Sequence, residues 1–337
     1  MSNSIIRIEP LGFPWKTSDP FLFCAYHEDD YPNGNGKMGP DASLSGRSIG
    51  QDFAGKDGWN MYHGSTVPGF PAHPHRGFET ITIVQKGLVD HADSLGAAGR
   101  FGNGDVQWMT AAKGVQHSEM FPLLNDEAPN PFLLFQIWLN LPKRSKFAEP
   151  HFKMLWDHTI PVHSVSNGGG TTEVTIVAGT LAGKTAPEPA PDSWAADPDH
   201  HVAVWTIKMA PGASFTIPAE AKGLNRSLFY FKGNSVNIGG KNVDVQHSIS
   251  LNSDVDAVIE NGDAESHFLF LQGKPINEPV AQYGPFVMNT QAEIREAMME
   301  FQVNQFGGWP WSKPDQVHDK ERGRFALHAD GREETPD

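Results

Sequence analysis

Short apolar runs that are repeatedly interrupted by turn residues limit most strongly how this chain can fold. Residues 80–84 form a β-branched run that ends at Gly87, and the run at 106–109 follows a turn at 102–105. The 34 glycines and 26 prolines of the 337-residue chain supply such turns throughout and argue against long helices. Short strands at intervals of roughly 8–12 residues predict an all-β fold, either a sandwich or a barrel. Further runs of this kind are at 88–92, 132–141, 172–177, 202–209, 227–231, 255–259 and 268–271.

The length of the chain and the distribution of these runs indicate two domains. A chain of 337 residues holds about two domains of ordinary size. The seam is expected at 142–150, where the chain turns polar and basic, so that residues 1–145 form the first domain and 146–305 the second. Residues 306–337 form a polar C-terminal tail, and its part from 318 onward mixes both charge signs and is expected to be mobile.

Three segments depart from the strand pattern. Residues 291–302 carry apolar side chains at spacings of three and four, which predicts a short helix. Thr290 is its predicted N-cap, and Glu293 completes a capping box. The stretches at 31–57, rich in Gly, Asp, Asn and Ser, and at 184–199, rich in Pro, Ala and Asp, are predicted to be long excursions between strands.

The net charge and the cysteine content exclude several classes of function. The formal net charge of −14 repels nucleic acid, so direct nucleic-acid binding is not expected, and a soluble monomer or a protein partner with a basic face fits better. Cys24, the single cysteine, allows no internal disulfide, which suits a reducing compartment. The first 15 residues do not read as a secretory signal, and no apolar stretch is long enough to span a membrane. A cytoplasmic location is therefore expected.

Two pairs of potential metal ligands stand out in the first half of the chain. His73 and His75 are two residues apart, as are His117 and Glu119, and residues at i and i+2 of a strand share a face. Two strands of one barrel can bring both pairs to a single ion. Glu79 has the same parity as the first pair and is a second possible carboxylate. Imidazole and carboxylate ligands without a thiolate suit Fe(II), Mn, Ni, Cu or Zn. The alternative is that these are ordinary core or surface histidines.

Several blocks around these pairs resemble the pirin family. The block that contains His73 and His75 is followed by a second block that contains His117 and Glu119, and further similar blocks lie near the C-terminal end. The resemblance covers nearly the whole chain. The similar blocks are residues 69–80, 93–96, 104–111, 114–120, 273–275, 278–280 and 283–290.

This resemblance implies a bicupin, with two tandem β-barrel domains of the double-stranded β-helix type and a short C-terminal helix. It implies one mononuclear metal site in the first barrel, with Fe(II) as the usual metal and Ni, Zn, Mn or Cu as alternatives. The implied ligands are His73, His75, His117 and Glu119. Glu79 then lies beside the ligands and is expected to pair with Arg76.

The second barrel is expected to hold no metal. It contains no pair of histidines two residues apart, and residues 223–227 occupy the stretch where ligands would be expected. Glu265 and His267 form one isolated pair, which is interpreted as surface residues at the start of a strand. The excursions at 31–57 and 184–199 are longer than expected for the family, so both can change access to a site.

The resemblance also implies two alternative functions. The first is a flavonol dioxygenase of the quercetin 2,3-dioxygenase type, in which Glu119 takes the proton of the flavonol 3-hydroxyl, O₂ attacks the ring and carbon monoxide is released. The second is a non-catalytic regulator, in which the metal reports redox state to a protein partner in a transcription or metabolic complex. A sugar-isomerase type of cupin is a third, weaker alternative.

Other notable residues are interpreted without a function. Lys143, Arg144 and Lys146 form a basic cluster that is predicted to be a solvated linker. The adjacent histidines at 200 and 201 are predicted to lie on the surface. Cys24 is predicted to be a small buried residue, and large aromatic residues such as Trp108 and Trp138 are predicted to fill the core.

Overall fold

The computed structural model describes residues 4–167 and 169–336, and the chain divides into two compact units. Domain A consists of residues 25–157 together with 278–337, whereas domain B combines the N-terminal segment that ends at residue 24 with residues 158–277. These units differ from the linear division predicted from the sequence, because each end of the chain packs with the domain that is distant in sequence. The N-terminal segment supplies the edge strand β1 (Ile5–Pro10), which pairs with β21 (His247–Leu251), and the C-terminal segment supplies β26 (Phe325–Leu327), which pairs with β7 (Ala98–Gly102).

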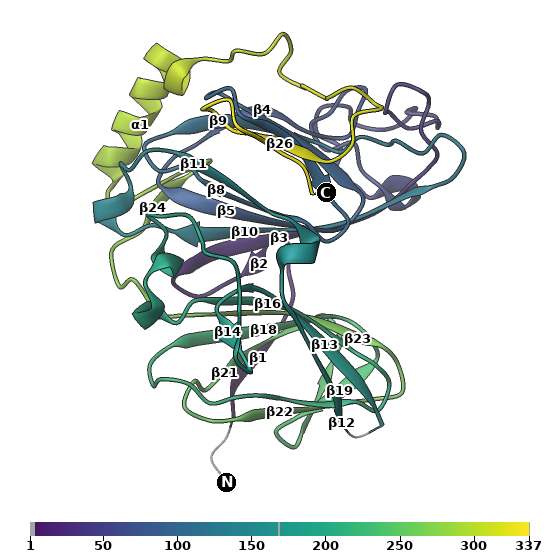
Figure 1. Cartoon of the computed structure of the whole chain (residues 1–337), viewed down its shortest axis with the longest axis vertical. Coiled ribbons are helices and arrows are strands. Elements are labelled where there is room, and N and C mark those ends of the chain that lie inside the picture. Colours follow the sequence, from purple (N-terminus) through teal and green to yellow (C-terminus); the bar gives the residue numbers. More distant parts are fainter. Residues whose placement is uncertain (1–3, 168, 337) are drawn as a thin grey trace. The chain divides into compact units, whose positions relative to one another are not determined.

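Domain A is built on two sheets, which appear as two layers in Figure 1. The aromatic and aliphatic side chains of its main core cluster include Tyr31, Phe101 and Phe132, which are almost inaccessible to solvent. The first sheet has the order β11 (His151–Leu155), β8 (Val106–Thr110), β5 (Phe78–Lys86), β10 (Asn130–Asn140) and β3 (Phe21–Tyr31), of which the residues from 25 onward belong to this domain. The short strand β2 (Trp15–Lys16) pairs with residues 23 and 24 of β3. The second has the order β27 (Glu333–Glu334), β26, β7, β6 (Leu88–Asp93), β9 (Val115–Met120) and β4 (Gly69–His75).

Domain B repeats this two-sheet arrangement with different strand numbers. Its core is formed by alternate residues of neighbouring strands, such as Leu228 and Tyr230 on one strand and Phe268 and Phe270 on the next. The larger sheet has the order β1, β21, β18 (Asn225–Lys232), β23 (Ser266–Gly273), β16 (Ala203–Met209), β13 (Gly170–Ala178) and β12 (Val162–Asn167). The smaller has the order β17 (Ser214–Ile217), β22 (Ala257–Asn261), β19 (Ser235–Ile238) and β20 (Lys241–Asp244). A short hairpin of β14 (Thr180–Leu181) and β15 (Lys184–Thr185) stands apart from both.

The all-β prediction is confirmed, and every predicted apolar run contains a strand. The strands that the pattern did not reveal, such as β1 and β12, expose most of their residues, so that they carry too few apolar side chains to form a run. The predicted helix is also confirmed, as α1 (Gln291–Asn304). Its capping box has the expected form: the Thr290 hydroxyl accepts from the Glu293 N–H at 3.2 Å, and the Glu293 carboxylate accepts from the Thr290 N–H at 2.8 Å. Among the described residues, no helix is long and apolar enough to cross a membrane.

The C-terminal segment, which the sequence predicts to be a mobile tail, makes specific contacts with the rest of domain A. Arg100 is fully buried, and its guanidinium forms an ion pair with Asp90 at 2.7 Å. The same guanidinium donates to the backbone carbonyls of Asp319 at 2.8 Å and Arg322 at 2.6 Å. A buried charge with directional donors fixes a polar segment that has little apolar surface of its own. The polarity of the segment could be read from the sequence, but its contacts with Arg100 could not.

Two predictions of surface residues are wrong for similar reasons. Lys146 is 1% exposed, and its ammonium donates to the Gly77 carbonyl at 2.7 Å, the Asn140 side-chain oxygen at 2.8 Å and the Val287 carbonyl at 3.1 Å. His200 is also buried, where its ring stacks on Trp194. In both cases nearby backbone carbonyls supply the partners that make burial of a polar group tolerable. Cys24 is buried, as predicted.

Replacement of Lys146 by methionine is expected to destabilise domain A by about 2–4 kcal/mol, because three buried acceptors lose their donor. Urea denaturation measures this effect, and Lys143→Met is the matched control, since the Lys143 side chain is 67% exposed.

Burial lowers the pKa of Lys146 from 10.5 to about 8. The unfolded chain then binds more protons between these pH values, so the contribution of Lys146 to stability rises with pH there, and the methionine variant lacks that rise. Equal destabilisation by both variants would contradict the assignment.

Candidate metal centre

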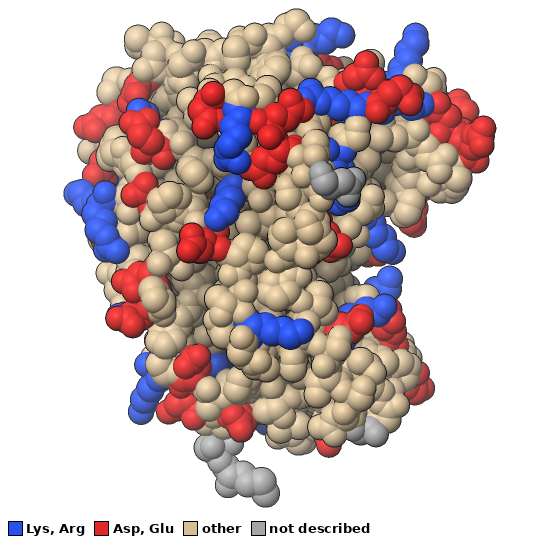
Figure 2. Space-filling view, viewed as in Figure 1, with Lys and Arg blue, Asp and Glu red and all other residues tan. Residues whose placement is uncertain are grey.

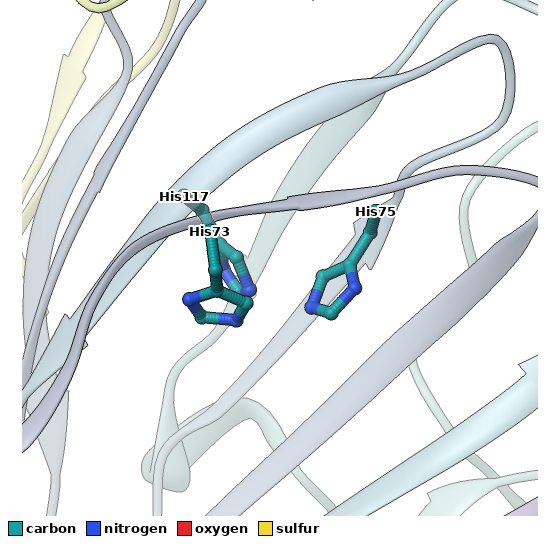
Figure 3. A group of neighbouring side chains, drawn as sticks. All are labelled: His73, His75 and His117. Carbon is teal, nitrogen blue, oxygen red and sulfur yellow. The ribbon is translucent and has the colours of Figure 1, made fainter. Parts of the chain in front are cut away.

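Three of the four predicted ligands converge in domain A. His73 on β4 and His117 on β9 are directly opposite each other in the antiparallel register, and His75 follows on the same face of β4. The ring centroids are 4.5 Å apart for His73 and His117 and 4.8 Å apart for each pair that includes His75. One potential ligand atom from each ring lies within 4.8 Å of the others. Figure 3 shows the three rings on the same side of the strand that carries His73 and His75.

Burial keeps these histidines in the neutral form that binds metals. His75 and His117 are buried, and desolvation together with the neighbouring histidines holds the pKa of each well below its ordinary value. Desolvation also lowers the pKa of His73 to about 4, although this residue as a whole is partly exposed. A neutral imidazole keeps the lone pair that a metal requires, so no proton has to be displaced at neutral pH.

The hydrogen bonding of the rings fits a metal ion. His73 Nδ1 lies 2.9 Å from the Pro71 carbonyl, which can only accept, so this nitrogen is the donor and Nε2 is left with its lone pair. Among the described residues, neither ring nitrogen of His117 has a hydrogen-bond partner, nor has Nε2 of His75. Buried polar atoms without partners are rare and costly. A divalent ion between the rings would bind one nitrogen of each ring, and the nitrogen donor set suits a transition metal.

Glu119, the fourth predicted ligand, lies beside this cluster rather than in it. Its Oε2 is 3.7 Å from His117 Nε2, and the carboxylate accepts from Gln136 Nε2 at 2.5 Å and from the Thr82 hydroxyl at 3.2 Å. Desolvation raises the pKa of Glu119, whereas the bond from Gln136, the neighbouring His91 and the bond from Thr82 lower it. The carboxylate is thus oriented by two strands of the opposite sheet, next to the histidines.

Glu79 and Arg76 do not form the pair that was expected. Glu79 is buried on β5 and accepts from the Thr110 hydroxyl at 2.7 Å. The Arg76 guanidinium instead forms an ion pair with Glu300 of α1 at 2.8 Å and donates to the Lys113 carbonyl at 2.6 Å. The two residues have opposite parity on either side of Gly77, whose φ of +89° interrupts the strand geometry between β4 and β5. Arg76 therefore serves to fix the helix.

His91 and Trp138 also border the histidine cluster, although the sequence analysis did not single them out for this role. The His91 ring centroid is 5.6 Å from that of His117, and its Nε2 is 3.3 Å from the Asp93 carboxylate. The Trp138 ring is 5.2 Å from His75 and stacks on Phe78. His91 and Asp93 show the same i, i+2 spacing as the ligand pairs, so a systematic search for that spacing would have included them. No such signal marks Trp138, which was interpreted as a core residue.

Domain B shows no comparable group. Among the described residues, the three histidines of domain A are the one cluster of three or more metal-ligating side chains within this range. The Glu265 carboxylate is 2.8 Å from the His267 ring at the start of β23, and the Glu265 side chain is 48% exposed. The pair has the surface position that the sequence predicted.

Comparison with known proteins places the chain in a family. The Pirin family model matches residues 15–139, and the model of the Pirin C-terminal cupin domain matches residues 204–307. Human pirin is 34% identical over 249 residues, which are 72% of this chain and 79% of the human protein. A Pseudomonas aeruginosa protein named "Putative quercetin 2,3-dioxygenase" is 33% identical over 238 residues, which are 71% of this chain and 79% of that protein.

The solved structures agree with this relationship. The crystal structure of a quercetin 2,3-dioxygenase from Acinetobacter baumannii superposes with a TM-score of 0.71 and 25% sequence identity, and the match covers 91% of this chain and 99% of that one. The two domains described above are therefore cupin domains, as the resemblance of the sequence implied. On the strength of the sequence blocks, the histidine cluster and these comparisons, the chain belongs to the pirin family.

Proposed function

We propose that this protein is a metal-dependent dioxygenase that opens flavonols of the quercetin type, with O₂ as its second substrate. The observation that carries the proposal is the group of three neutral histidines beside the oriented carboxylate of Glu119. Two similar proteins bear the name of this activity, one of them with a structure that matches nearly the whole chain.

In this proposal the metal is held by His73, His75, His117 and Glu119, with Fe(II) as the first choice and Ni, Zn, Mn or Cu as alternatives. When bound, such a metal acts as a Lewis acid that lowers the pKa of a hydroxyl group next to it. The fit rests on the ring nitrogens that lack partners and on the neutral state of the rings. His73 is partly exposed while His75 and His117 are buried, so substrate reaches the site from the side of His73.

Glu119 has a second role as the base that accepts the proton of the flavonol 3-hydroxyl on a carboxylate oxygen. Gln136 and Thr82 hold that carboxylate at an angle fixed by their strands, so it needs little reorganisation when substrate binds. The stacked rings of Trp138 and Phe78 form an apolar wall beside His75, which keeps water from that side of the histidines. Attack of O₂ on the deprotonated ring and release of carbon monoxide complete the reaction.

Oxygen uptake by metal-loaded protein tests this proposal. We expect one metal per chain in protein purified without oxygen and loaded with Fe(II), all of it in domain A, and oxygen uptake with carbon monoxide release when quercetin is added. A flavone that lacks the 3-hydroxyl is the control and should give no uptake, because it offers no proton to Glu119. Two metals per chain, one of which survives replacement of both His73 and His75, would contradict a single site.

A second candidate function is metal-dependent binding of a basic protein partner. The net charge of −14 favours it, and on the face drawn in Figure 2 acidic side chains lie among the basic ones at many positions. The experiment above separates the two functions, because fully metal-loaded protein that consumes no oxygen with any flavonol would favour the regulator.

A further inference from the structure

Two buried polar residues, Arg226 and Gln272, lie at one end of the apolar core of domain B, on neighbouring strands of the larger sheet. Arg226 on β18 has the same parity as Leu228 and Tyr230, which pack in the core, and it is 4% exposed. Gln272 of β23 is its direct neighbour in the antiparallel register and is 5% exposed. An inward position that would otherwise hold an apolar side chain thus holds a guanidinium.

This guanidinium lacks the carboxylate that the other buried arginines of the chain possess. Arg226 donates from Nε to the Gln272 side-chain oxygen at 2.6 Å and from Nη2 to the Pro218 carbonyl at 2.9 Å, and both acceptors are neutral. Its Nη1 is buried and has no partner among the described residues. By contrast, the buried residues Arg47 and Arg100 each form an ion pair with an aspartate within 3 Å, at 2.9 Å and 2.7 Å.

The lack of a carboxylate beside Arg226 is energetically unfavourable. A buried charge with unused donors is costly unless an opposite charge meets it. Burial lowers the pKa of Arg226, while the more distant carboxylates of Glu220 and Asp256 raise it without forming a hydrogen bond to it. An anion supplied from outside the chain meets the requirement best, because charge-assisted bonds to a carboxylate use the planar fork of the guanidinium.

A cavity of about 380 Å³ lies against Arg226 and Gln272. This volume lies within the roughly 300–1,000 Å³ that is usual for small-molecule sites. Trp205 and several alanine and proline side chains provide apolar lining, and one wall is formed by the predicted excursion at 184–199. That wall is fixed, since the Trp194 indole donates to the Lys274 carbonyl at 2.8 Å and the Ala186 N–H donates to the Gly179 carbonyl at 2.9 Å.

The rim of the cavity limits the charge of a ligand. Glu188, Asp197 and Glu220 line it and are exposed, with His201 3.8 Å from the Glu220 carboxylate. Water screens these exposed carboxylates more than it screens the buried guanidinium. A single negative charge at the inner end is therefore favoured, whereas a second negative charge near the rim is repelled.

We propose that this cavity of domain B binds a small monocarboxylate with an apolar, ring-sized body, whose carboxylate pairs with Arg226 and whose body packs against Trp205. The site is separate from the metal centre, which lies in domain A. It also gives a role to the excursion at 184–199, which supplies the outer wall.

Calorimetric titration of the full-length, metal-loaded protein with benzoate tests this site. We expect benzoate to bind once per chain, and benzamide and terephthalate to bind at least about tenfold more weakly, because the first lacks the charge and the second adds one at the rim. Arg226→Gln should weaken benzoate binding by about 10- to 100-fold, as loss of a charge-assisted hydrogen bond predicts, should weaken benzamide binding much less, and should leave the metal content unchanged.

Two further variants keep the test decisive if Arg226→Gln folds poorly. Gln272→Glu gives Arg226 an internal carboxylate in an isosteric side chain, so it should remove benzoate binding while stabilising the fold. Ala196→Trp, at an exposed lining position, should block benzoate and benzamide alike. The proposal is overturned if benzoate fails to bind at millimolar concentration, if Gln272→Glu binds it as well as the wild type, or if benzylamine binds more tightly than benzoate.

Discussion

Replacement of His117 by alanine is expected to abolish metal binding while the fold survives. His117 is fully buried at the centre of the cluster, directly opposite His73, and no other described histidine is positioned to take its place between His73 and His75. Loss of one of so few nitrogen ligands should reduce bound metal from one per chain to below about a tenth, and oxygen uptake with it. Metal analysis by plasma emission gives the first quantity directly.

The fold should tolerate this change because the domain is held together mainly by buried apolar side chains. Removal of a buried imidazole leaves a small cavity, with a cost on the order of 1–3 kcal/mol, but it also removes two buried nitrogens without partners. His63→Ala is the matched control, since His63 is the exposed histidine on the loop before β4 and should keep its metal. Unfolding of both His117→Ala and the metal-free wild type would show that the site is structural.

Replacement of Glu119 by glutamine is expected to separate metal binding from turnover. The amide has the size of the carboxylate and can still accept from Thr82 or Gln136, so the position of the side chain should persist. It cannot accept a proton from a flavonol hydroxyl. Because general-base assistance typically contributes a factor of about 10²–10⁴, turnover per bound metal should fall by that factor, while most of the metal is retained.

Turnover per bound metal at saturating Fe(II) is the quantity to compare. Glu79→Gln is the control, because Glu79 is an equally buried carboxylate of the same domain that is bound by Thr110. It should keep its turnover. If Glu119→Gln has wild-type turnover per bound metal, Glu119 is not the base. If its activity is lost but returns when excess metal is added, Glu119 serves as a ligand alone.

The sequence by itself determined the local features of this protein. Strands appear wherever a β-branched or aromatic run is bounded by glycine or proline, because both signals act within a few residues. The start of α1 was predictable for the same reason, since a capping box involves only Thr290 and Glu293. The three histidines could be grouped because side chains two residues apart lie on the same face of a strand. His73 and His75 are therefore expected on one face before the fold is known.

The resemblance to a family added what these local rules leave open. It supplied the cupin architecture and the preference for Glu119 over Glu79 as the carboxylate of the site. In the structure Glu119 lies 3.7 Å from His117 and Glu79 is bound by Thr110, but whether Glu119 binds metal stays a prediction.

Only the tertiary structure decided the features that depend on partners distant in the chain. The burial of Lys146 depends on the carbonyls of Gly77 and Val287, and the packing of the C-terminal segment depends on Arg100, more than 200 residues before it. The exchange of terminal segments between the domains, and the unpaired Arg226 at the end of the core of domain B, are of the same kind. The sequence does not reveal whether water or a distant carbonyl provides the hydrogen-bond partner of a polar residue. The reason is that tertiary packing, and not local periodicity, determines this partner.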